Sequence, residues 1–109
     1  MATLPVQTVT ATGTTPDYDA ASPTGDKVRP GGRVVLHFRN AGLDPVTVTL
    51  VTPGTVQGLA IADRTVTVPA AGDVLVTVSA DLYADPADSG LASFTYSATT
   101  DVTVAALRV

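Results

Sequence analysis

Apolar and polar residues alternate along most of the chain after residue 32, which is the pattern of strands with one buried face. The run RVVLHFRN places Val34, Leu36 and Phe38 on one face and His37 on the other. The runs VTVTLV, RTVTVP, VLVTVS, LASFTYSA and VTVAALRV repeat this pattern, and clusters of Gly, Pro and Asp separate them. No segment has a convincing 3.6-residue period, so the alternation predicts strands and not helices.

About seven such runs, with turn signals every roughly 8–12 residues, are typical of a sandwich or barrel. Val and Thr dominate the runs, and both are β-branched residues that favour strands. We therefore predict an all-β fold, a single small antiparallel β-sandwich of Ig-like or jelly-roll-like type, in residues 33–109. The expected buried face of its central hairpin consists of Val66, Val68, Val74, Val76 and Val78.

Residues 1–32 follow a different pattern, because they are rich in Thr, Pro, Gly and Asp and show one short strand-like run, Val6 to Thr12. The stretch TGTTPDYDAASPTGDKVRPGG has many breaker positions and no periodicity. We expect an extended N-terminal arm that is ordered mainly by contact. It is either a disordered terminus or a segment that lies on a neighbouring subunit.

Composition excludes several classes of protein. The 109 residues fit one domain, and the absence of cysteine removes disulfide frameworks, zinc–thiolate sites and thiol nucleophiles. The net charge is −4 and all ten acidic residues are Asp, a turn former, so the chain lacks the basic footprint of a nucleic-acid-binding protein. We also expect no signal peptide and no membrane span, because no apolar run approaches about 20 residues.

The one histidine, His37, is the first candidate for chemistry. A histidine relay needs a nucleophile and an orienting carboxylate close in space, and the chain has no Gly-x-Ser-x-Gly motif to supply the nucleophile. We interpret His37 as a partly exposed strand residue or a subunit contact. The chain is expected not to be an enzyme.

The loop DLYADPADSG is the second candidate, because Asp81, Asp85 and Asp88 lie close together in it. Two carboxylates can serve glycoside hydrolysis, and loop carboxylates can bind calcium. The spacing does not match an EF-hand, and Asp next to Pro and Gly is typical of turns. We favour turn-forming roles here and at Asp63 and Asp73, and we predict neither a metal nor a cofactor.

The basic cluster around RPGGR contains Lys27, Arg29 and Arg33. It is not a phosphate-binding loop, because no strand precedes the glycines and no Lys-Ser/Thr pair follows them. It is interpreted as a solvated turn that leads into the first core strand, or alternatively as a contact for an acidic neighbouring surface.

Three stretches carry a resemblance to a known group of proteins: GDKVRPGGRVVLHFRNAG, VTVTLVTPGTVQGLAIADRTVTVPAAGD and LYADPADSGLASFTYSATTDVTVAALRV. From Gly25 to the C-terminus the chain resembles small structural proteins of tailed bacteriophages that infect actinobacteria, and it is similar to capsid decoration (cement) or minor head proteins. The resemblance implies a virion protein on the capsid exterior, made in the host cytoplasm. It would form a homotrimer and clamp neighbouring major capsid protein subunits.

Two alternatives to a decoration role stay open: a head–tail connector, stopper or tail component, and an Ig-like adhesion or binding module on a virion or cell surface. We expect the major capsid protein as the partner, together with self-association, and neither nucleic acid nor membrane. The loop Leu82–Pro86 is the preferred place for a subunit contact. The predicted partner-contact residues are Tyr18, Lys27, Arg29, Arg33, Leu82, Tyr83 and Asp85.

Overall fold

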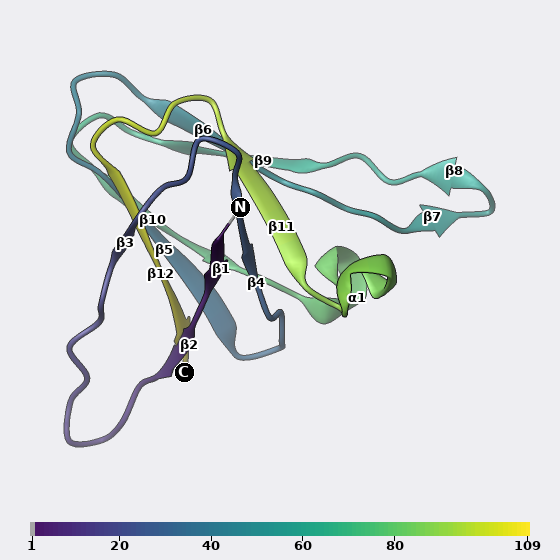
Figure 1. The fold of residues 1–109 in the computed structure, drawn as a ribbon, viewed down its shortest axis with the longest axis horizontal. Coiled ribbons are helices and arrows are strands. Elements are labelled where there is room, and N and C mark those ends of the chain that lie inside the picture. The colour runs from purple at the N-terminus through teal and green to yellow at the C-terminus, as the bar shows by residue number, and fades with distance from the viewer. Residues whose placement is uncertain (1) are drawn as a thin grey trace.

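The computed structural model describes residues 2–109, whose two main β-sheets pack face to face (Figure 1). Sheet A has the strand order β1 (Ala2–Leu4), β4 (Asp26–Val28), β11 (Ala92–Tyr96), β6 (Val46–Leu50) and β9 (Arg64–Val68). Sheet B has the order β10 (Asp73–Thr77), β5 (Val34–Asn40), β12 (Val102–Arg108) and β2 (Val6–Thr8), and β3 (Asp19–Ala20) also pairs with β12. The predicted all-β sandwich is confirmed.

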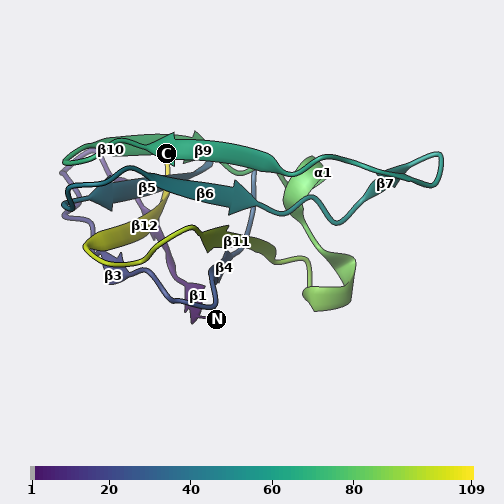
Figure 2. The same ribbon diagram turned by 90° about the horizontal axis from the view of Figure 1, so that it is seen from above.

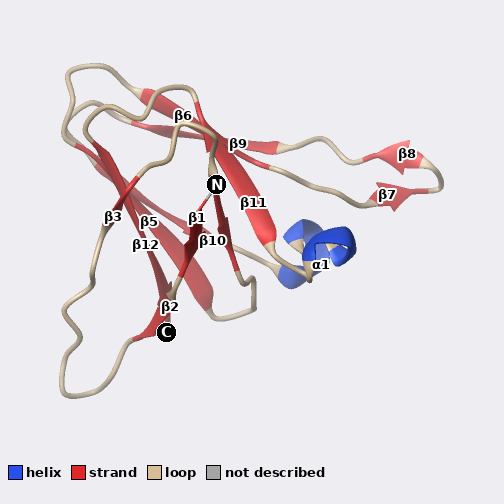
Figure 3. Ribbon diagram, viewed as in Figure 1, coloured by secondary structure: helices blue, strands red, loops and turns tan. Residues whose placement is uncertain are grey.

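The helical segments are short and lie together at one end of the sandwich (Figure 3). They are α1 (Ala80–Tyr83) and a 3₁₀ turn, Pro86–Asp88. Ser79 caps α1, because its hydroxyl accepts a hydrogen bond from the Asp81 amide, and the Asp85 carboxylate accepts from the Ala87 amide in the same way. The longest predicted loop of the second half is therefore built from two capped turns.

The core lies between the two sheets, where the inward positions of the alternating runs meet. Val34, Leu36 and Phe38 of β5 are at most 1 % exposed, as their pattern predicts. Phe38 from sheet B meets Phe94 from sheet A edge to face, with ring centroids 5.6 Å apart, and Tyr96 packs against both rings. These three rings join the sheets in a core that otherwise consists mostly of Val, Leu and Ala.

The N-terminal third is part of the sandwich, which corrects two predictions. Residues 2–32 contain four strands and not one, and β4 lies inside sheet A between β1 and β11. The chain passes from sheet A to sheet B at Pro5, because β1 pairs with β4 in sheet A and β2 pairs with β12 in sheet B. Both pairings are parallel, so the sheets are mixed and not purely antiparallel.

A carboxyl group lies buried in β4. Asp26 is fully buried, and its Oδ2 accepts hydrogen bonds from the Tyr96 hydroxyl at 2.6 Å and from the Ser22 amide at 3.3 Å. Among residues 2–109, its Oδ1 atom has no hydrogen-bond partner. Burial raises the pKa of Tyr96 far above its ordinary value of 10.0, and the hydrogen bond to Asp26 and the charge of that residue raise it further.

A hairpin projects from the sandwich beyond α1 (Figures 1 and 2). It consists of β7 (Thr55–Val56) and β8 (Leu59–Ala60), and Gln57 and Gly58 form its two-residue turn with φ values of 51° and 78°. Positive φ at both positions is the geometry of a type I′ hairpin turn. We call residues 52–62 the finger.

The base of the finger is fixed by hydrogen bonds across its two arms. Thr52 donates its amide to Asp63 Oδ1 at 2.9 Å and its hydroxyl to the Ile61 carbonyl at 2.7 Å. Asp63 therefore has the scaffold role that the sequence predicts, but the element that it supports is the finger.

Candidate functional site

A hydrogen-bonded chain of three side chains lies on the outer face of sheet B. The Tyr18 hydroxyl is 2.7 Å from His37 Nδ1, and His37 Nε2 is 2.9 Å from Asp73 Oδ2. With the ring proton on Nε2, His37 accepts from Tyr18 and donates to Asp73. The Arg39 guanidinium lies 5.2 Å from the centre of the Tyr18 ring, within the range of a cation–π contact.

Strand register brings these residues together. Leu75 of β10 pairs with His37 of β5, so Asp73 lies on the same face two positions away. Tyr18 comes from the segment just before β3 and packs edge-on against the imidazole ring. Sequence reasoning treated Asp73 as a turn residue and Tyr18 as a partner contact, because neither is near His37 in the chain.

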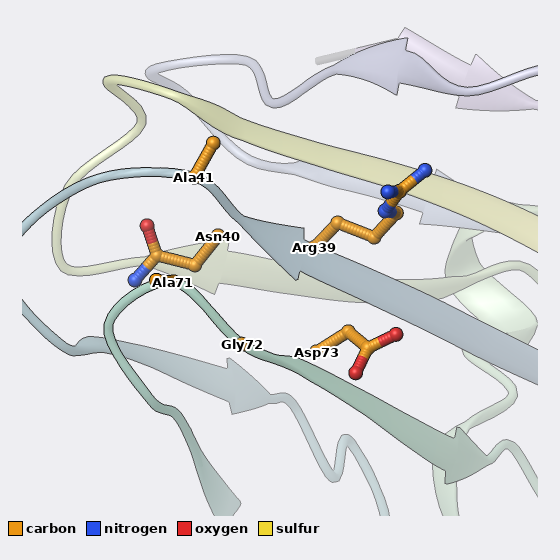
Figure 4. Close-up of a pocket in the computed structure, with 6 residues that line it drawn as sticks. All are labelled: Arg39, Asn40, Ala41, Ala71, Gly72 and Asp73. Atoms are coloured by element: carbon orange, nitrogen blue, oxygen red, sulfur yellow. The ribbon is translucent and has the colours of Figure 1, made fainter.

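The order hydroxyl, imidazole, carboxylate is that of a nucleophile, a base and an orienting group. The neighbouring cavity of about 440 Å³ is lined by Arg39, Asn40, Ala41, Ala71, Gly72 and Asp73 (Figure 4). Tyr18 and His37 do not line this cavity, so the Tyr18 hydroxyl does not face it. The hydrogen bonds instead fit a structural role, in which they hold the N-terminal segment on sheet B.

Tyr18→Phe is expected to loosen this attachment of the N-terminal segment while the core stays intact. The variant removes one hydrogen bond, worth about 0.5–1.5 kcal/mol, and leaves His37 Nδ1 exposed to water. Amide hydrogen exchange measured by NMR should become faster in residues 9–20 and stay unchanged in β5 and β12. Equal acceleration in those core strands would show that Tyr18 does not act locally.

Residues of the loop 81–90 make contacts with other parts of the same chain. Lys27 Nζ lies 2.6 Å from Asp88 Oδ2, and the Arg29 guanidinium donates to the Ser89 carbonyl at 2.9 Å. These two cations therefore fasten the loop to β4 and the residue after it. Within residues 2–109 no group of three His, Cys, Asp or Glu side chains is placed to hold a metal ion, and the three aspartates of the loop do not converge.

The remaining predicted contact residues differ in exposure. Tyr83 is 6 % exposed and belongs to the core cluster, whereas Leu82 is 41 % exposed and Arg33 lies on the surface. Leu82 and Arg33 are therefore the more accessible of these side chains. A partner contact at any of the predicted residues stays a prediction.

The finger is a surface that sequence reasoning missed. Its residues 53–60 are all exposed, and the paired side chains Val56 and Leu59 at its tip are 62 % and 73 % exposed. No ionisable residue occurs between Asp44 and Asp63, so the finger carries no charge. The absence of charged residues over such a long run of an acidic chain is the sequence feature that could have indicated this surface.

A groove of about 440 Å³ lies where the sandwich is open, between β9, β10 and α1. β9 and β10 are the last strands of their sheets, so Val66, Val74 and Val76 point into this opening and are only half-buried. Leu82 of α1 extends the apolar lining, and Leu75 of β10 borders the groove from the outer face of sheet B. Arg64 is the one charged side chain among the groove residues.

No family model matches the chain, no curated protein is similar to it, and no solved structure matches its fold. Among residues 2–109, the structure has no helix long and apolar enough to span a membrane.

Proposed function

We propose that this chain is a virion structural protein, namely a capsid decoration (cement) protein. It binds the outer surface of the major capsid protein lattice as a homotrimer and stabilises that lattice. The observation that supports this proposal is the finger, which is a projecting, uncharged element whose apolar side chains are exposed in the isolated chain.

The finger is difficult to explain in a protein that acts alone. A two-stranded hairpin without a covering layer is only marginally stable in water, and Val56 and Leu59 bury little within their own chain. Exposed apolar patches on a monomer commonly mark surfaces that contact another protein. A small rigid sandwich with one such projection suits a protein whose task is to hold neighbours together.

Cementing a capsid requires binding energy and no chemical step. A protein that binds one lattice state and not another stabilises the bound state, by about 2.7 kcal/mol at a free concentration of 100 times Kd. The acidic surface with its net charge of −4 keeps free copies apart, and the uncharged finger is the part that meets the least repulsion.

Leu59→Asp is expected to reduce binding to expanded capsids by at least about tenfold, because the variant places a charge in an apolar contact. Leu43→Asp is the matched control, since Leu43 is 95 % exposed and lies in a different loop. The measurement is co-sedimentation of each purified variant with capsids that lack the protein. Equal binding by the two variants would contradict a role for the finger.

Copy number and target decide between decoration and the alternatives. Decoration requires a number of copies per particle in proportion to the lattice, whereas a connector or tail component would be present as one ring. If the wild-type protein bound host cells and not expanded capsids, the decoration proposal would be wrong and an adhesion role would replace it.

A further inference from the structure

The finger tip and the groove are two apolar surfaces that nothing covers within the described residues, and every copy of the chain has one of each. We propose that the finger of one copy binds in the groove between β9, β10 and α1 of a second copy. The contact is head to tail, so a closed ring of three copies satisfies every finger and every groove. This inference rests on the proposed self-association, and it names the surfaces that form it. It places the finger in the contact between copies, so Leu59→Asp would weaken capsid binding by dissociating the ring.

The chemistry of the two surfaces matches. The finger presents Val56 and Leu59, and the groove presents half-buried valines together with Leu82. The finger has no charge to desolvate, and Arg64, the one charged residue of the groove, is exposed and can keep its guanidinium in water. The rest of the acidic chain repels a second copy, so an uncharged contact is favoured over others.

Backbone groups support the same pairing. β10 pairs with β5 on one side, and β9 pairs with β6, so each strand has a free edge at the groove. The outer edges of β7 and β8 are also free in the finger. An extended segment that adds to a free sheet edge gains main-chain hydrogen bonds, which is a common mode of recognition between proteins.

The geometry favours a second copy over the same copy. The finger continues directly into β9 through Asp63, so its base lies beside its own groove and its tip points away from the sandwich (Figures 1 and 2). A surface on one end of the molecule and a complementary surface at another position form a heterologous contact, which closes into a ring when the rotation allows it.

The size of the contact explains why a ring is needed. Each arm of the finger is about five residues long and spans roughly 17 Å, and a ribbon roughly 10 Å wide and thick buries on the order of 350 Å² per partner when half of its surface is covered. The total of about 700 Å² is below the roughly 1,200 Å² of stable complexes. One contact is therefore weak, and a closed ring or a capsid lattice has to hold the copies together.

Cysteine cross-linking tests this pairing directly, because the natural chain has no cysteine. Two single variants, Val56→Cys and Leu82→Cys, are purified separately, mixed at high concentration and oxidised. A disulfide requires Cα atoms within about 7 Å, so a heterodimer forms only where the finger of one copy reaches the groove of another. The matched control replaces Leu82→Cys by Leu43→Cys, a more exposed position outside the groove.

We expect the Val56→Cys and Leu82→Cys mixture to give at least about tenfold more heterodimer than the control mixture. Adding Leu59→Asp to the finger variant should abolish that excess. Equal yields in both mixtures, or no heterodimer at all, would overturn the inference. If the variants cross-link but the protein does not bind capsids, the contact between copies is supported and the decoration role is refuted. If the protein binds capsids but the variants do not cross-link, the decoration role is supported and the contact between copies is refuted.

Discussion

Tyr96→Phe is expected to lower the free energy of unfolding by about 3 kcal/mol, although it removes a single oxygen atom. The hydroxyl of Tyr96 is the closest partner of the buried Asp26 carboxyl group, at 2.6 Å. Without it, Oδ2 keeps only the Ser22 amide at 3.3 Å within the described residues 2–109, and Oδ1 already has no partner there. The variant therefore leaves a fully buried carboxyl group with almost no compensation, and urea-induced unfolding measures the loss.

The double variant Asp26→Leu/Tyr96→Phe separates this mechanism from a general loss of packing. Leucine has the same number of side-chain heavy atoms as aspartate, with the same branch at Cγ, and needs no hydrogen bond, so the double variant should recover most of the stability that Tyr96→Phe loses. The interaction free energy from the double-mutant cycle is expected to exceed about 1 kcal/mol. Additive losses would show that the hydrogen bond is not the cause.

The Asp26–Tyr96 pair also shows where sequence reasoning stops. Asp26 lies in a segment with Pro, Gly and Thr, and the run DKV is too short to show alternation, so it was assigned to an arm. Its burial depends on Tyr96, which is 70 positions away in the chain. A three-residue strand whose stability comes from such distant partners leaves no local pattern.

The strands that sequence did predict have their signal in their own residues. In β5, β6 and β11 every second side chain enters the core, and the buried positions are the apolar ones that the alternation indicates, except for the buried Asn40 at the end of β5. At the open edge the same pattern gave the correct face, but Val74 and Val76 are only half-buried because no further strand covers them. Alternation shows which face is apolar, and the strand order determines how far it is covered.

The candidate sites were less predictable, because each depends on strand order or on exposure. The Tyr18–His37–Asp73 chain joins three segments through the β5–β10 register, which the sequence does not contain. The finger has no buried face, so it has no alternation, and Gln57-Gly58 is a weaker hairpin signal than the Asn-Gly that type I′ turns prefer. Its lack of charge was the signal that sequence reasoning did not use.

Alkaline pH is expected to destabilise the protein through the same tyrosine. The pKa of Tyr96 is raised in the folded state by burial and by Asp26, whereas in the unfolded chain it stays near the ordinary value of 10.0. The unfolded chain therefore releases this proton above about pH 10 while the folded chain keeps it. The stabilisation is complete below that pH and is lost as the pH rises, by up to about 1.4 kcal/mol for each pH unit.

The comparison with Tyr96→Phe isolates this proton, because the other titrating groups are the same in both proteins. Urea-induced unfolding at about pH 9, 10, 11 and 12 should give a steeper fall for the wild type, so that the stability difference between the two proteins narrows above pH 10. At about pH 12 the wild type should have lost most of its stability advantage over Tyr96→Phe. Parallel pH profiles would mean that Tyr96 ionises equally in both states, and the buried hydrogen bond to Asp26 would then not hold its proton.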